Sequence, residues 1–274
     1  MPSETIQLRE SQLAIDDGVA VFTHQRPAAR NALSLDLRMD YRDMLGHVEG
    51  ARSVRALVVT GSGGSFCAGG DLKARQTNPD PEFRTADAMR RRVQSGHTWI
   101  ERLRALEVPV IAAVDGAAAG AGFSIALAAD FILASHRAFF CMSFVKIGLI
   151  PDLGAFHFLP RAVGLPMAKE LAMTARRVNA AEGKQLGFVH SLHEPDALQD
   201  DAMRFARRFT AAPREAMGLT KTLLNKSFET PYATLAELEA NAQAVACTTP
   251  FHNDAIEAFL RGEPAAFDWD RPAG

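Results

Sequence analysis

The chain has 274 residues, of which 47% are hydrophobic and 23% charged, a balance that supports a folded core and excludes an intrinsically disordered protein. Its formal net charge of -2, without a polybasic face, argues against nucleic acid and anionic membranes as partners. The N-terminal residues are polar and acidic, and no apolar run reaches the ~18 residues of a membrane span, so we expect a cytoplasmic protein. Cys67, Cys141 and Cys247 lack metal-ligand spacing, so we expect reduced thiols and no metal.

The first part of the chain predicts a hairpin, a helix and a buried strand. Residues 12–25 alternate in polarity on either side of an Asp-Gly pair, which is typical of a β-hairpin. Ser34 is a candidate cap for a helix, because apolar residues recur at helical spacing after it. The run VRALVVTG (54–61) predicts a buried strand with helices on both of its sides.

Strands and helices continue to alternate as far as Pro160. Residues 82–106 predict one long amphipathic helix, and residues 121–130 predict another. Further strands are predicted at residues 108–116, 131–135 and 138–143. This alternation predicts an α/β fold with buried, mostly parallel strands.

After Pro160 the pattern is almost entirely helical, apart from a short strand in the sequence FVHSL (188–192). We therefore divide the chain into a core of residues 1–199 and a helical C-terminal region of residues 200–274. The apolar stripes of that region either cap the core or pack against another subunit.

Two glycine-rich turns each follow a predicted buried strand: FCAGGDL (66–72) and DGAAAGAG (115–122). Small residues let backbone N–H groups approach a ligand closely, and the second turn opens a helix whose N-terminus favours negative charge. Neither turn has the spacing of a phosphate-binding loop. Two such turns could direct their amides at one oxygen, which is the geometry of an oxyanion hole.

These turns and their neighbours resemble the crotonase, or enoyl-CoA hydratase/isomerase, superfamily. The resemblance runs from about residue 12 to residue 262 and rests on several motifs in the family's order. They are RPAARNAL (26–33), SFCAGGDLK (65–73), VIAAVDGAAAGAGFSIALAADFILAS (110–135) and IGLIPDLGAFHFLPRAVG (147–164). The resemblance implies a ββα spiral core, a helical oligomerisation region, and an acyl-CoA thioester as substrate.

The resemblance also implies roles for individual residues. The N–H groups of Gly70 and Ala121 would bind the thioester carbonyl and stabilise an enolate. Coenzyme A would enter only as part of the substrate, with no separate cofactor. The positions at which the family holds its adenine and phosphates are Arg26, Arg30, Ala32, Ala68, Asp71, Leu72 and Lys73.

Hydratases of this family use two glutamates, and this chain has Ser124 and Phe144 at those positions of the substrate site. Neither side chain acts as a general base near neutral pH. One acid, Asp152, lies in the loop that lines the family's acyl pocket. The pattern is therefore most similar to that of enoyl-CoA isomerases with a single catalytic aspartate.

The sequence leaves alternatives open. An aromatic residue at position 144 with an acid at position 152 also resembles a dehalogenase branch that forms an aryl-enzyme ester. A hydratase with unusual acid placement is a second alternative, and a catalytically inactive CoA-thioester-binding protein is a third. The Pro-Asp-x-Gly sequence around Asp152 also favours a plain turn.

The resemblance implies a homotrimer, or a hexamer formed as a dimer of trimers. Phe259 matches a phenylalanine that completes the neighbouring subunit's CoA site, whereas the family's nearby lysine is replaced by Gly262.

Overall fold

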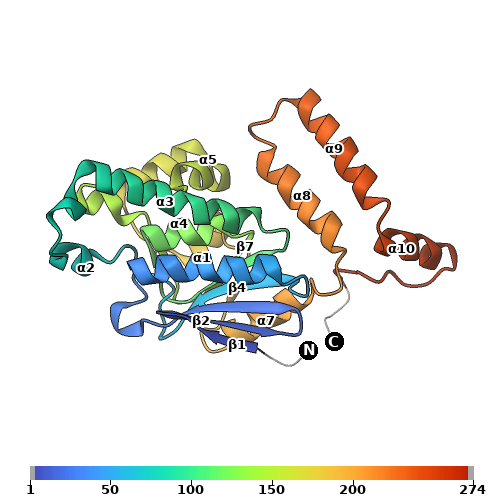
Figure 1. Cartoon of the computed structure of the whole chain (residues 1–274), viewed down its shortest axis with the longest axis horizontal. Helices are drawn as coiled ribbons and strands as arrows, with labels where there is room; N and C mark the ends of the chain where they lie inside the picture. Colours follow the sequence, from blue (N-terminus) through green and yellow to red (C-terminus); the bar gives the residue numbers. More distant parts are fainter. Residues whose placement is uncertain (1–3, 271–274) are drawn as a thin grey trace.

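A seven-stranded sheet lies at the centre of the computed structural model, which describes residues 4–270 without the side chains of residues 81 and 84 (Figure 1). Its order is β1-β2-β3-β4-β5-β7-β10; the first three strands are antiparallel and the rest pair in parallel. The strands are β1 (Glu4–Gln7), β2 (Ser11–Asp16), β3 (Val19–His24), β4 (Ala56–Gly61), β5 (Val110–Val114), β7 (Phe131–Ser135) and β10 (Ser191–His193).

The predicted hairpin is confirmed as β2 and β3, which pair from Ser11 opposite His24 to Asp16 opposite Val19. Its turn residues Asp17 and Gly18 both have positive φ, 45° and 78°, as a tight hairpin turn requires. Ser34 is confirmed as a helix cap, since its side chain accepts a hydrogen bond from the Leu37 amide at the start of α1 (Leu35–Gly50).

The parallel strands are buried on both faces, as predicted. Alternate residues of β4 face opposite ways, so Leu57 and Val59 join the core beneath α1, α3 (Ala86–Ala105) and α4 (Ala121–Ala128). Ala56 and Val58 join a second apolar cluster with α7 (Leu198–Arg207). This two-sided burial fixes the ends of β4 and β5, where the two glycine-rich turns begin.

The long helix predicted at residues 82–106 is confirmed as α3 over Ala86–Ala105, but its predicted start is wrong. A 3-10 turn (Pro81–Arg84) ends at Thr85, whose side chain accepts a hydrogen bond from the Ala88 amide and starts α3 afresh. A short helix that the sequence did not indicate, α2 (Leu72–Thr77), precedes this break and begins at Asp71. Both differences lie in the segment that borders the candidate site.

A second, three-stranded sheet and two further helices complete the core. The sheet has the order β6-β8-β9 and comprises β6 (Ala117–Ala119), β8 (Phe139–Cys141) and β9 (Val178–Asn179). Helix α5 (Ala155–Thr174) starts earlier than predicted and is interrupted at Gly164, which has non-helical φ and ψ of 75° and 158°. Helix α6 (Ala180–Gln185) lies between β9 and β10.

The last three helices are α8 (Arg214–Lys226), α9 (Tyr232–Ala246) and α10 (Pro250–Leu260). Helix α8 contacts the core through the ion pair of Lys221 with Asp130, whereas α9 and α10 stand away from the sheet (Figure 1). Helix α7 packs on the sheet. It spans the predicted division of the chain between residues 199 and 200, and that division stays a prediction. Within residues 4–270, no helix is both long enough and apolar enough to cross a membrane.

Candidate active site

The two glycine-rich turns are held against each other by backbone hydrogen bonds. The Cys67 amide donates to the Ala117 carbonyl at 2.9 Å, and the Ala119 amide donates to the Cys67 carbonyl at 3.0 Å. Gly122, in the first turn of α4, allows this contact, because a Cβ there would lie 2.1 Å from the Cys67 oxygen. The turn after β4 therefore packs directly on the N-terminus of α4.

Gly122→Ala should lower the free energy of unfolding by about 3 kcal/mol, because its methyl group must push the Cys67 backbone away from α4. Gly46→Ala, in the exposed middle of α1 with nothing within 4 Å of its Cβ, is the control and should be stabilising by about 0.5–1 kcal/mol. Urea unfolding of both variants measures the difference. Equal stability of the two variants would contradict the close contact.

The amides of Gly70 and Ala121 lie where these turns meet. The Leu33 amide donates to the Gly69 carbonyl, and the Leu33 carbonyl accepts from the Asp71 amide. The N–H of Gly70, which lies between these two residues, therefore faces away from Leu33. Ala121 is the first residue of α4, where helical amides have no partner within the helix. Among the described residues neither N–H donates a hydrogen bond to protein, and both residues line one cavity. The arrangement has two free donors at one site.

This cavity has a volume of about 350 Å³ and extends from the two amides beneath α2 to α3. It brings together most of the residues predicted for the site: Arg26, Ala68, Gly70, Asp71, Leu72, Ala121, Phe144 and Asp152. These residues, which are far apart in the sequence, therefore line one cavity, and their roles stay predictions.

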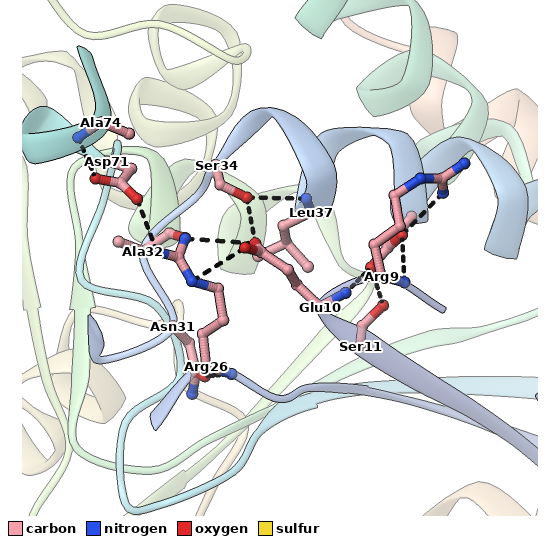
Figure 2. Close-up of polar contacts among 11 residues, drawn as sticks. Arg9, Glu10, Ser11, Arg26, Asn31, Ala32, Ser34, Leu37, Asp71 and Ala74 are labelled. Atoms are coloured by element: carbon pink, nitrogen blue, oxygen red, sulfur yellow. Dashed lines mark hydrogen bonds and ion pairs between the residues drawn. The ribbon is translucent and has the colours of Figure 1, made fainter. Parts of the chain in front are cut away.

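Arg26 lines the cavity, and each nitrogen of its guanidinium contacts a protein oxygen. Its guanidinium forms ion pairs with Glu10 at 3.1 Å and with Asp71 at 2.9 Å, and it also donates to the Ala32 carbonyl (Figure 2). Ser34 donates a further bond to Glu10. Burial of Asp71 acts to raise its pKa, but the hydrogen bond from the Ala74 amide and the bond and charge of Arg26 hold that pKa below its ordinary value. In this structure Arg26 connects the chain segments around the cavity.

Asp152 lies in a turn just before α5, and its side chain lines the cavity. Leu153 and Gly154 have φ of 52° and 83°, and the Ala155 amide donates to the Asp152 carbonyl at 3.2 Å, which fixes the turn. Its Oδ1 is buried and has no hydrogen-bond partner among the described residues. Burial raises the pKa of the Asp152 carboxyl, and the charges of Arg38 and His97 offset part of the rise. The group therefore holds a proton more tightly than an exposed aspartate does.

The structure places the other predicted residues outside this cavity. Arg30 and Lys73 are exposed, and Ala32 is half-buried beside Arg26. Ser124 is fully buried, and its hydroxyl donates to the Gly120 carbonyl at 3.4 Å within α4. Phe259 is 80% exposed on α10. None of these residues lines the cavity in a single chain.

Histidines take no direct part in the cavity. His24 is a packed core residue between the Phe66 carbonyl and the Tyr41 hydroxyl, and burial lowers its pKa to about 4. His193 links Ser191 at 2.7 Å and Asp201 at 2.6 Å, a bonding order that resembles a catalytic triad. Neither group lines the cavity that holds the free amides. The second group joins β10 to α7.

Sequence reasoning missed the arginines of the cavity wall, Arg38, Arg75 and Arg92. Arg38 was the one with a detectable signal, because it precedes buried Tyr41 by three residues and buried Leu45 by seven on α1. A basic residue at that spacing lies at the edge of the buried face.

Comparisons with known proteins agree on one family. Residues 14–270 match the family described as enoyl-CoA hydratase/isomerase. The chain is 33% identical to a 1,2-epoxyphenylacetyl-CoA isomerase from Escherichia coli (strain K12), covering 90% of this chain and 93% of that protein. It is also 33% identical to a crotonyl-CoA hydratase from Syntrophomonas wolfei, with coverages of 92% and 95%. A crystal structure of an enoyl-CoA hydratase/isomerase from Cupriavidus metallidurans CH34 superposes with a TM-score of 0.91 at 38% identity, covering 98% of this chain and all of that one.

Proposed function

Because this chain belongs to the enoyl-CoA hydratase/isomerase family, we propose that it moves the double bond of an enoyl-CoA thioester from the 3,4 to the 2,3 position. One observation carries the proposal. Among the described residues, the buried Oδ1 of Asp152 has no hydrogen-bond partner, and this residue lines the same cavity as two amides without partners, those of Gly70 and Ala121. The chemistry of a 3-enoyl thioester requires a base near carbon 2 and donors at the carbonyl oxygen.

The two amides act on the thioester carbonyl. When a proton leaves carbon 2, negative charge moves onto the carbonyl oxygen and a dienolate forms. The N–H groups of Gly70 and Ala121 donate to that oxygen, and the positive end of α4 adds to their effect. Each preorganised donor of this kind stabilises the transition state by about 3 kcal/mol.

Asp152 carries the proton. Its carboxylate removes a proton from carbon 2, the double bond moves between carbons 2 and 3, and the new carboxylic acid returns the proton to carbon 4. The reaction therefore needs no other acid, no water and no redox partner. The raised pKa of Asp152 brings its proton affinity closer to that of the carbon acid than an exposed aspartate would have.

The other acids of the cavity do not suit hydration. Glu10 and Asp71 are paired with Arg26, and Asp36 is exposed at the start of α1. Hydration of a 2-enoyl-CoA needs a second group that orients water, and no such acid lies beside Phe144 among the described cavity residues. These contacts favour isomerisation over hydration.

A paired assay tests the proposal. Purified protein should convert 3-hexenoyl-CoA into 2-hexenoyl-CoA and should not hydrate crotonyl-CoA. Hydration of crotonyl-CoA without double-bond movement would support the alternative of a hydratase with unusual acid placement. Binding of both thioesters without turnover of either would support a catalytically inactive CoA-thioester-binding protein. Either of these outcomes contradicts the isomerase.

We also propose that the chain assembles as a homotrimer or as a hexamer formed from two trimers. The last three helices and the loop between α8 and α9 carry large apolar side chains that are 66–85% exposed in one chain: Leu224, Phe228, Tyr232, Phe259 and Leu260. Burying such a surface against a second copy is favourable, because apolar area leaves water. In such an assembly Phe259 would contact the CoA of a neighbouring subunit.

A further inference from the structure

Arg38 lines the same cavity as Asp152, yet its guanidinium has no hydrogen bond or ion pair among the described residues. It reaches from α1 across to Gly96 on α3. A Cβ at Gly96 would lie 3.3 Å from Arg38 Nη1 and 2.6 Å from Leu153 Cδ2. The missing side chain at Gly96 therefore makes room for the guanidinium next to Leu153, the residue that follows Asp152.

The charged groups around Arg38 do not neutralise it. Asp152 attracts it, but the two side chains are not within ion-pair distance, and the nearby thiol of Cys67 is neutral because burial raises its pKa to about 11. Arg42 and Arg92 repel it. Arg92 itself donates a hydrogen bond to the Phe83 carbonyl at 2.6 Å, and its guanidinium lies over the Phe83 ring. Arg38 thus has five N–H donors available in a partly buried place.

A contrast with Arg26 shows what is missing. Both arginines line the cavity, but Arg26 is held by the carboxylates of Glu10 and Asp71, whereas Arg38 has no equivalent. A partly buried guanidinium gains most from a carboxylate that meets two of its N–H groups at once. Among the described residues no side-chain carboxylate meets Arg38 in this way, which leaves its N–H groups available to a ligand of this cavity.

We propose that Arg38 binds a carboxylate at the far end of the substrate's acyl group, so that the chain prefers CoA thioesters of dicarboxylic acids. This inference rests on the proposed function of the same cavity. The acyl group extends from the amides of Gly70 and Ala121 past Asp152, and Arg38 lies beside that aspartate. The apolar side chains of Phe144 and Leu149 also line this cavity and suit the carbon chain between its two ends.

Binding of saturated thioesters tests the proposal without turnover, so its outcome does not depend on whether the protein is an isomerase. Calorimetry should compare butanedioyl-, pentanedioyl-, hexanedioyl- and octanedioyl-CoA with the monocarboxylic thioesters of equal chain length, and with free CoA. We expect at least one dicarboxylic thioester to bind about 10-fold more tightly than its neutral counterpart. If none does, the proposal is wrong, whatever the isomerase assay gives.

Variants of Arg38 test whether this arginine causes the preference for dicarboxylic thioesters. Arg38→Met should weaken binding of the preferred dicarboxylic thioester about 10-fold and leave the neutral thioester and free CoA within about twofold. Arg38→Lys, which keeps the charge but loses the planar fork, should give an intermediate loss. Arg42→Met is the matched control, since Arg42 lies one turn later on α1, is exposed and does not line the cavity. Equal weakening of all three ligands by Arg38→Met would mean that Arg38 contacts the CoA moiety, and would overturn the proposal.

Discussion

Asp152→Asn should lower kcat/KM for 3-hexenoyl-CoA by about 10³-fold. The asparagine side chain keeps the size of the carboxylate but cannot accept and return a proton. The backbone N–H groups of Gly70 and Ala121 remain in place. Binding of saturated hexanoyl-CoA should therefore change by less than about threefold. Steady-state kinetics and calorimetry separate the two effects.

The stability of this variant provides the control for folding. The native-state pKa of Asp152 is raised above that of the unfolded chain, so the native state binds the proton more tightly. The carboxyl therefore lowers stability as the pH rises above the pKa of the unfolded state. Asp152→Asn removes this loss, so its thermal midpoint should equal or exceed that of the natural protein at pH 7. An inactive variant that is also less stable at pH 7 would leave folding as the cause and contradict this account.

Ala121→Pro should lower kcat by about 10²- to 10³-fold, because it replaces one oxyanion donor with a ring carbon. Ala121 is the first residue of α4, a position where proline fits a helix well. The preceding Gly120, with φ of 50° and ψ of -120°, has no Cβ to collide with the ring. The substitution therefore removes the N–H with little change to the helix.

Ala86→Pro is the matched control for that substitution. Ala86 is the exposed first residue of α3, and the preceding Thr85 is extended, with φ of -68° and ψ of 154°. Its activity should stay within about twofold of the natural protein. Full activity of Ala121→Pro in a folded protein would show that this amide does not hold the carbonyl.

Many elements of the fold can be predicted from short stretches of the sequence. The Asp17-Gly18 turn, the Ser34 cap and the apolar run of β4 each form for reasons that involve only near neighbours. The small sheet could not be predicted in the same way. Its strand β6 consists of three alanines, which have little strand preference, and it forms because β8 pairs with it.

The candidate site divides along the same line. The glycine-rich turns and the Pro-Asp-x-Gly loop that carries Asp152 can be recognised in the sequence. The structure brings Gly70, Ala121 and Asp152 to one cavity. The pairing of Arg26 with Glu10 and Asp71 was not visible, because it joins residues that are far apart in the chain. Long-range pairing decides whether a charge is free for a ligand, as the contrast between Arg26 and Arg38 shows.

The buried, unpaired carboxyl of Asp152 costs stability and has no structural use among the described contacts. Its turn is nevertheless well fixed by Leu153 and Gly154, both with positive φ. A rigid turn that presents an unsatisfied acid to a cavity is typical of a functional group, because function compensates for what the fold loses.

Transfer of a deuterium label tests the role of Asp152 most directly. The protein should convert 3-hexenoyl-CoA that carries deuterium at carbon 2 into 2-hexenoyl-CoA that carries part of that label at carbon 4, and Asp152→Asn should abolish both the reaction and the transfer. Nuclear magnetic resonance of the product locates the label. Product in which carbon 4 carries only hydrogen from water would show that the abstracted proton is not the one returned, and would contradict the account.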